Sequence, residues 1–192
     1  MRISGGKYVN KKIITHDKKV NEDVDFRATA ERTRQAIFNI IQNASFIPEN
    51  FLDGAVVADI YCGCGSFGLE ALSRGAKKAI FVDQSPKQLE IVKTNLEALN
   101  EASNAKLIRA DATLLPKMDL ECKIVYLDPP YNINLVNPTL KSIANSGWLS
   151  KEHLIIVESA KQEDVKESDK LKILDVRTYG KSKVTFCYFS SL

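Results

Sequence analysis

The sequence has few of the residues that build metal sites or disulfide frameworks, and it has no long apolar run. It contains four cysteines and two histidines in 192 residues. A single residue separates Cys62 from Cys64, whereas at least two residues usually separate paired zinc ligands. We therefore expect no metal and free thiols. No apolar stretch approaches the roughly 18 residues of a membrane span, and the N-terminus lacks the apolar core of a secretory signal. The expected compartment is the cytoplasm, with no membrane partner.

The positive charge is concentrated at the N-terminal end. Residues 1–34 carry nine Lys or Arg against five Asp or Glu, while the rest of the chain carries 18 against 19. Such an excess attracts a polyanion such as nucleic acid. On charge alone, a solvated basic surface explains the pattern equally well.

From residue 55 onward, short apolar runs alternate with longer amphipathic stretches. The alternation predicts a mostly parallel sheet covered by helices on both faces. Two closing runs are too near each other for a helical crossover, so we expect an antiparallel last strand in a seven-stranded sheet. The predicted strands are 55–60, 78–82, 106–108, 123–127, 154–157, 172–179 and 183–189, and the predicted helices are 68–74, 86–99 and about 137–145.

Two further pieces precede this core. Turn-forming residues between Arg2 and Ile14 predict a small hairpin, and apolar spacing predicts a helix from Thr29 to Asn43. We therefore divide the chain into an N-terminal extension at 1–50, on the side expected to bind RNA, and a catalytic domain at 51–192.

The first chemical motif is a glycine loop between a strand and a helix. Gly63, Gly65 and Gly68 form G-x-G-x-x-G after Asp59, and Asp83 follows at the end of the next strand. Glycines allow a tight turn and close approach of a ligand to the backbone, and an acid at the second strand end accepts hydrogen bonds from ribose hydroxyls. The order of these features predicts a site for a nucleoside-containing cofactor.

The second motif follows the fourth strand directly. It reads Asp128-Pro129-Pro130-Tyr131. The prolines fix the backbone and leave carbonyl groups without local partners. A carboxylate and a rigid carbonyl can together accept both hydrogens of an exocyclic amine, while an aromatic ring stacks on the base that carries it. This motif favours S-adenosylmethionine over a nicotinamide dinucleotide as the cofactor.

These motifs together resemble the class I S-adenosylmethionine-dependent methyltransferases, and in particular the RsmD family. Further matching blocks lie at residues 2–8, 27–40, 68–76 and 179–180, in the family's order. The resemblance implies a Rossmann-like fold and methylation of N2 of a guanine in 16S ribosomal RNA, on a ribosomal small-subunit particle. Ala28 stands where the family usually has proline, and Cys62 and Cys64 replace small neighbours in the glycine loop.

The resemblance also implies roles for individual residues. Asp111, after the third strand, would accept a hydrogen bond from the adenine amine of the cofactor. Asp59 would support the glycine loop and the methionine end of the cofactor. Asp128 and the Pro129 carbonyl would hold the target amine, and Tyr131 would stack on the base. Apart from the resemblance, six basic residues of the N-terminal end are candidates for phosphate contacts, because cations at a helix N-terminus oppose its dipole and suggest another use; they are Lys7, Lys11, Lys12, Arg27, Arg32 and Arg34.

Two alternatives stay open at this stage. An adenine-N6 methyltransferase acting on RNA or DNA uses the same tetrapeptide. A dinucleotide-binding or nucleic-acid-binding module without catalysis would explain the glycine loop, but not Asp128 to Tyr131. The single core predicts a monomer, and Glu158, after the fifth strand, receives no role from the sequence.

Overall fold

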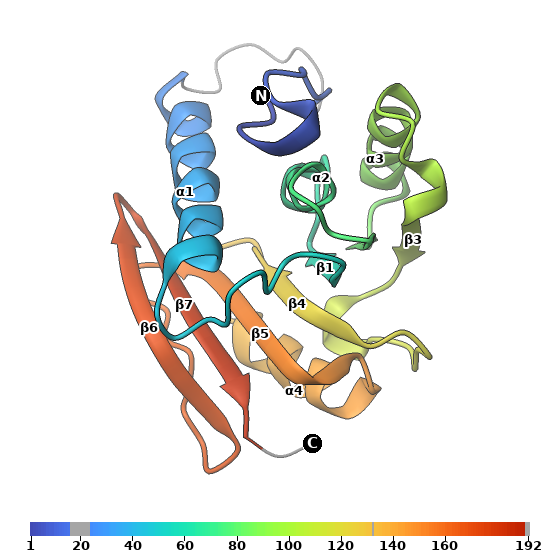
Figure 1. The fold of residues 1–192 in the computed structure, drawn as a ribbon. Helices are drawn as coiled ribbons and strands as arrows, with labels where there is room; N and C mark the ends of the chain where they lie inside the picture. The colour runs from blue at the N-terminus through green and yellow to red at the C-terminus, as the bar shows by residue number, and fades with distance from the viewer. Residues whose placement is uncertain (16–23, 132, 191–192) are drawn as a thin grey trace.

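A seven-stranded sheet forms the centre of the molecule (Figure 1). The structure is a computed structural model that describes residues 1–15, 24–131 and 133–190, with side chains of the second range described from residue 30. The strand order is β3-β2-β1-β4-β5-β7-β6. The predicted α/β architecture is therefore confirmed, including all seven strands.

The strands pair in the directions predicted from the lengths of the segments that connect them. The first five pair in parallel, whereas β7 pairs antiparallel with both β5 and β6. β5 is three times as long as the predicted 154–157 strand, because it continues through polar residues at both ends. The strands are β1 (Val56–Ile60), β2 (Lys78–Asp83), β3 (Ala105–Arg109), β4 (Cys122–Leu127), β5 (Leu149–Ala160), β6 (Leu171–Tyr179) and β7 (Ser182–Phe189).

Helices cover both faces of the sheet. Apolar residues of α1, α2 and α3 pack on one face, and those of α4 pack on the other. The α-helices are α1 (Val24–Asn43), α2 (Ser66–Ser73), α3 (Pro86–Ala98) and α4 (Val136–Ser146), and the short 3₁₀ turns are η1 (Gly6–Tyr8), η2 (Ala102–Asn104) and η3 (Ala112–Leu114).

The predicted hairpin at residues 2–14 is present in a short form. Arg2 and Lys12 form one antiparallel bridge, flanked by backbone hydrogen bonds from the Ile3 N–H to the Lys11 carbonyl and from the Ile13 N–H to the Met1 carbonyl. Between these arms the chain forms η1 and lies against α2: the backbone N–H of Tyr8 donates to Ser73 Oγ at 2.9 Å. The loop of the hairpin is therefore docked on α2.

Helix α1 begins at Val24, earlier than the predicted Thr29. Alanine at position 28, where the family usually has proline, is compatible with a helix that continues through this position. Ile37, Phe38 and Ile41 of α1 pack in the same core as Val57 of β1. The boundary at residue 50 stays a prediction.

Within the described residues, no helix is long and apolar enough to cross a membrane. The same part of the chain contains no cluster of three or more His, Cys, Asp or Glu arranged to hold a metal ion.

Candidate active site

The predicted cofactor and acceptor residues meet at the carboxyl ends of the parallel strands. β1 lies between β2 and β4, so the chain changes direction across the sheet at β1 and β4. Open α/β sheets bind ligands at such a switch point. The glycine loop follows β1, and Asp128 follows β4, with its backbone N–H 3.4 Å from the Ile60 carbonyl oxygen.

The glycine loop turns through left-handed backbone conformations. Gly63 and Gly65 have φ of 52° and 79°, and Tyr61 adopts φ of 62° despite its side chain. A Cβ on Gly68 would lie 2.4 Å from Phe81, so this glycine allows α2 to pack on β2. A Cβ on Gly63 would meet nothing within 4 Å. Gly63 thus borders open space, whereas Gly68 serves packing.

Asp59 lies buried beneath this loop. Its Oδ2 accepts a hydrogen bond from the N–H of Gly68 at 2.9 Å, which joins β1 to the first turn of α2. Loss of hydration, together with the nearby carboxylate of Asp83, raises the pKa of Asp59 to about 7. The structure therefore places Asp59 as a support of the loop, not on its open side.

Asp83 is half-buried at the end of β2 and faces the loop. Its two carboxylate oxygens accept hydrogen bonds from the N–H groups of Gly63, at 3.1 Å, and Ser85, at 2.8 Å. Asp111 is exposed beyond β3, where the hydroxyl and N–H of Thr113 bond its Oδ1 and lower its pKa. Oδ1 is thus occupied locally, while Oδ2 of Asp111 has no protein donor among the described residues.

The tetrapeptide after β4 presents one carboxylate and one free carbonyl. Among the described residues, no backbone or side-chain donor bonds the carbonyl oxygen of buried Pro129, whereas Pro130 is exposed. By surface area Asp128 is exposed. Loss of hydration beside the packed strand ends, and the carboxylates of Glu158 and Asp59, raise its pKa above the ordinary range.

Tyr126 and Glu158, to which the sequence assigned no role, also belong to this site. The hydroxyl of Tyr126 donates to Glu158 Oε2 at 2.8 Å, and that of Tyr131 lies 3.3 Å from Oε1 of the same carboxylate. Burial and the carboxylates of Glu158 and Asp128 raise the pKa of Tyr131. A strand-end position on the same face as Tyr126 is the sequence signal that could have identified Glu158.

The cysteines of the glycine loop are not nucleophiles. Burial raises the pKa of the Cys62 and Cys64 thiols, and the carboxylate of Asp59 acts in the same direction. A thiol held in its neutral form reacts poorly. The four cysteines are free, as expected.

The basic residues divide into two groups. Lys11, Lys12 and Arg32 are exposed and have no carboxylate partner among the described residues, while exposed Lys7 pairs with Glu101 at 2.5 Å. The side chain of Arg27 lies outside the described residues.

Arg34 is different, and its assignment to an exposed basic surface is wrong. It is 5% exposed, its Nε lies 3.4 Å from Glu70 Oε2, and it donates to the Arg2 carbonyl at 2.6 Å. Arg34 is three and four residues before Ile37 and Phe38, so it lies on the buried face of α1. From there it bonds both Arg2 and Glu70 and holds the N-terminal segment against α2.

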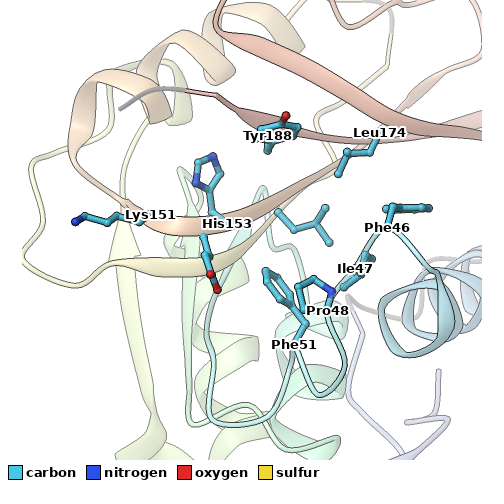
Figure 2. Close-up of a pocket in the computed structure, with 10 residues that line it drawn as sticks. Phe46, Ile47, Pro48, Phe51, Lys151, His153, Leu174 and Tyr188 are labelled. Atoms are coloured by element: carbon cyan, nitrogen blue, oxygen red, sulfur yellow. The ribbon is translucent and has the colours of Figure 1, made fainter.

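A separate apolar pocket of about 370 Å³ lies near the start of β5, between this strand and residues 46–51 (Figure 2). It includes Phe46, Phe51 and Leu174, beside His153 near the start of β5. His153 is held by the Ser150 carbonyl at 2.7 Å and the Phe189 N–H at 2.9 Å, and burial lowers its pKa. The imidazole is therefore neutral and structural, and the pocket is not part of the site described above.

Comparison with known proteins places the chain in a family. A family model described as "Conserved hypothetical protein 95" matches residues 1–188. The chain belongs to this family. Among its relatives, "Ribosomal RNA small subunit methyltransferase D" of Escherichia coli is 31% identical over 160 residues, which cover 83% of this chain and 74% of the relative. The resemblance to the RsmD family is confirmed.

Solved structures agree on the fold of this family member. The E. coli protein named "Putative methyltransferase yhhF" superposes with a TM-score of 0.82 and 25% identity, over 100% of this chain and 99% of that one. Magnesium protoporphyrin IX methyltransferase from Synechocystis, solved with bound SAM, gives 0.66 at 17% identity, covering 91% and 87%. The second comparison shows the class I methyltransferase fold alone.

Proposed function

We propose that the chain is an S-adenosylmethionine-dependent methyltransferase that methylates N2 of a guanine in 16S ribosomal RNA. The observation that carries the proposal is the position of Asp128–Tyr131. This segment lies beside the glycine loop at the switch point of the sheet, with a carboxylate and an unbonded carbonyl on one rigid turn.

The residues around the glycine loop fit the proposed cofactor. Gly63 leaves open space next to backbone N–H groups, and the carboxylate of Asp83 is fixed at the rim by two of them. Each carboxylate oxygen has a further lone pair, so Asp83 can still accept from ribose hydroxyls. Oδ2 of Asp111 is available for an adenine amine. When bound, the cofactor supplies a methyl group on a sulfonium, which is a strong leaving group.

The protein's task is then to orient the target amine. The guanine amino nitrogen is a weak nucleophile because its lone pair is delocalised into the ring. Asp128 and the Pro129 carbonyl accept its two hydrogens, which favours a tetrahedral nitrogen and directs the lone pair toward the methyl group. Catalysis by positioning and electrostatics follows, with Asp128 stabilising the positive charge that develops on nitrogen.

Tyr131 holds the base in this geometry. Base–aromatic stacking contributes about 1–3 kcal/mol, and a flipped base needs such a surface in place of its neighbours. The two prolines before Tyr131 restrict the backbone at this turn, so they place the base of the tyrosine side chain next to the acceptors. The orientation of the ring depends on its side-chain contacts.

RNA would approach over the N-terminal segment. Lys11, Lys12 and Arg32 are exposed cations of that end without a carboxylate partner among the described residues, and Lys7 is exposed but paired with Glu101. Phosphate contacts position a substrate without reading its sequence. We expect a monomer acting on a small-subunit particle.

The test is the methylation of ribosomal RNA in cells that lack this protein. Mapping of modified guanines in 16S RNA should show one N2-methylguanosine missing, and wild-type protein should restore it while Asp128→Ala does not. An unchanged set of N2-methylguanosines would contradict the proposal. Loss of an N6-methyladenosine instead would identify the enzyme as an adenine methyltransferase.

A further inference from the structure

Glu158 lies where strand geometry brings it next to the tetrapeptide. Tyr126 of β4 pairs with Ile156 of β5 in parallel register. Side chains two residues apart along a strand share a face. Continuing the register by two residues places Asp128 beside Glu158, on the face that also holds Tyr126.

The Glu158 carboxylate joins the core to the tetrapeptide. Its Oε2 accepts from Tyr126, whose ring stacks on Phe67 with centroids 4.1 Å apart and planes at 7°. Its Oε1 faces the hydroxyl of Tyr131 at 3.3 Å. One oxygen is thus fixed by a buried aromatic stack, and the other reaches the ring proposed to hold the base.

Nothing in the surrounding core requires a negative charge at this position. Glu158 is 9% exposed, and within the described ranges no Lys, Arg or His forms an ion pair with it. A buried carboxylate without a cation is costly, and a neutral glutamine would serve the Tyr126 hydroxyl at lower cost. The packing around Glu158 therefore does not explain its negative charge, which calls for a functional explanation.

We propose that Glu158 is a positioning residue of the active site, which holds the Tyr131 ring through its hydroxyl and places a second negative charge beside Asp128. The inference rests on the proposed function. Asp128 faces Asp59 from β1, Glu158 from β5, and the phenols of Tyr126 and Tyr131, while Arg34 of α1 acts on Asp59. Of these groups, only Glu158 bonds both tyrosines.

Glu158→Gln tests the proposal because it keeps the size and one acceptor oxygen but removes the charge. We expect kcat for methyl transfer to fall at least roughly tenfold, with unchanged S-adenosylmethionine affinity. Without the neighbouring negative charge, the pKa of Asp128 falls. The acidic limb of the pH–rate profile should then move to lower pH, which a purely structural change would not cause. Glu152→Gln, exposed near the start of the same strand, should change neither quantity.

Tyr131→Phe separates the two effects. It should reproduce the loss of kcat but leave the acidic limb in place, because the charge of Glu158 remains. Wild-type kcat together with an unshifted limb in Glu158→Gln would overturn the proposal.

A structural measurement keeps the inference independent of activity. If the wild-type protein binds cofactor but transfers no methyl group, the proposed function fails, and crystal structures of wild type and Glu158→Gln still decide the role of Glu158. Displacement of the Tyr131 ring in the variant supports positioning. An unmoved ring overturns it. Should Glu158→Gln fail to fold, Tyr126→Phe, which frees the carboxylate from its anchor, provides the same comparison of ring position.

Discussion

Asn95 of α3 bonds both backbone groups of Ile14. Its Oδ1 accepts from the Ile14 N–H at 2.7 Å, and its Nδ2 donates to the Ile14 carbonyl at 2.9 Å and to the Cys64 carbonyl at 3.1 Å. Asn95 is 2% exposed. One buried amide therefore joins the N-terminal segment to the glycine loop.

Asn95→Ala should weaken the binding of both ligands of the proposed enzyme. The backbone groups of Ile14 and Cys64 lose these hydrogen bonds, each of which contributes about 0.5–1.5 kcal/mol. We expect lower affinity for S-adenosylmethionine and for RNA, measured by calorimetry and filter binding. Thr94→Ala, exposed on the same helix, is the matched control. Loss of stability with both affinities intact would show that the link is structural only.

The buried Asp59 predicts a fall in stability at rising pH. Its pKa in the folded state, about 7, lies above the ordinary value of 3.8. The folded state therefore favours the protonated acid, and this contribution is complete below about pH 4 and is lost as pH rises through 7. Denaturant titrations should show the free energy of unfolding of wild type falling by roughly 1–4 kcal/mol relative to Asp59→Asn between about pH 5 and 8.5. Parallel curves for the two proteins would exclude the buried acid as the cause.

Asp83→Ala should reduce affinity for S-adenosylmethionine by roughly tenfold or more while the fold persists. Hydrogen bonds to a charged acceptor contribute about 1.5–3 kcal/mol each, and the variant also releases the N–H of Gly63 from its fixed position. Calorimetry on the variant and on the exposed control Asp119→Ala measures the difference. Unchanged affinity in a folded Asp83→Ala protein would remove Asp83 from the cofactor site.

Replacing Lys11, Lys12 and Arg32 by alanine should weaken RNA binding and make its dependence on salt shallower. Each phosphate contact contributes about 0.7–0.9 to the slope of log affinity against log salt concentration. A charge-matched triple variant at Lys141, Lys151 and Lys172, exposed elsewhere, should retain both the affinity and the slope.

Arg34→Ala should behave differently from that triple variant. Buried Glu70 would lose one of its two arginine partners, so the free energy of unfolding should fall by about 3–5 kcal/mol. Wild-type stability together with a shallower salt slope would return Arg34 to the RNA surface.

The sequence predicted the sheet and the order of the site well because both depend on local patterns. Gly63, Asp83 and Asp128 each follow a strand that its own apolar run identifies. Parallel strands then bring those strand ends to one edge whatever the details of packing.

The errors arose where long-range contacts decide. Glu158 bonds tyrosines 27 and 32 residues away, and no local pattern reports such a bond. Arg34 appeared exposed because its partners, Glu70 and the Arg2 carbonyl, lie on other segments of the chain.

Product analysis with purified protein tests the central claim most directly. Small subunits lacking the modification, incubated with labelled S-adenosylmethionine and wild-type protein, should yield N2-methylguanosine in 16S RNA. Asp128→Ala, which removes the acceptor, should bind the cofactor as tightly as wild type and yield none. Label on adenine N6, or wild-type transfer by Asp128→Ala, would contradict the account.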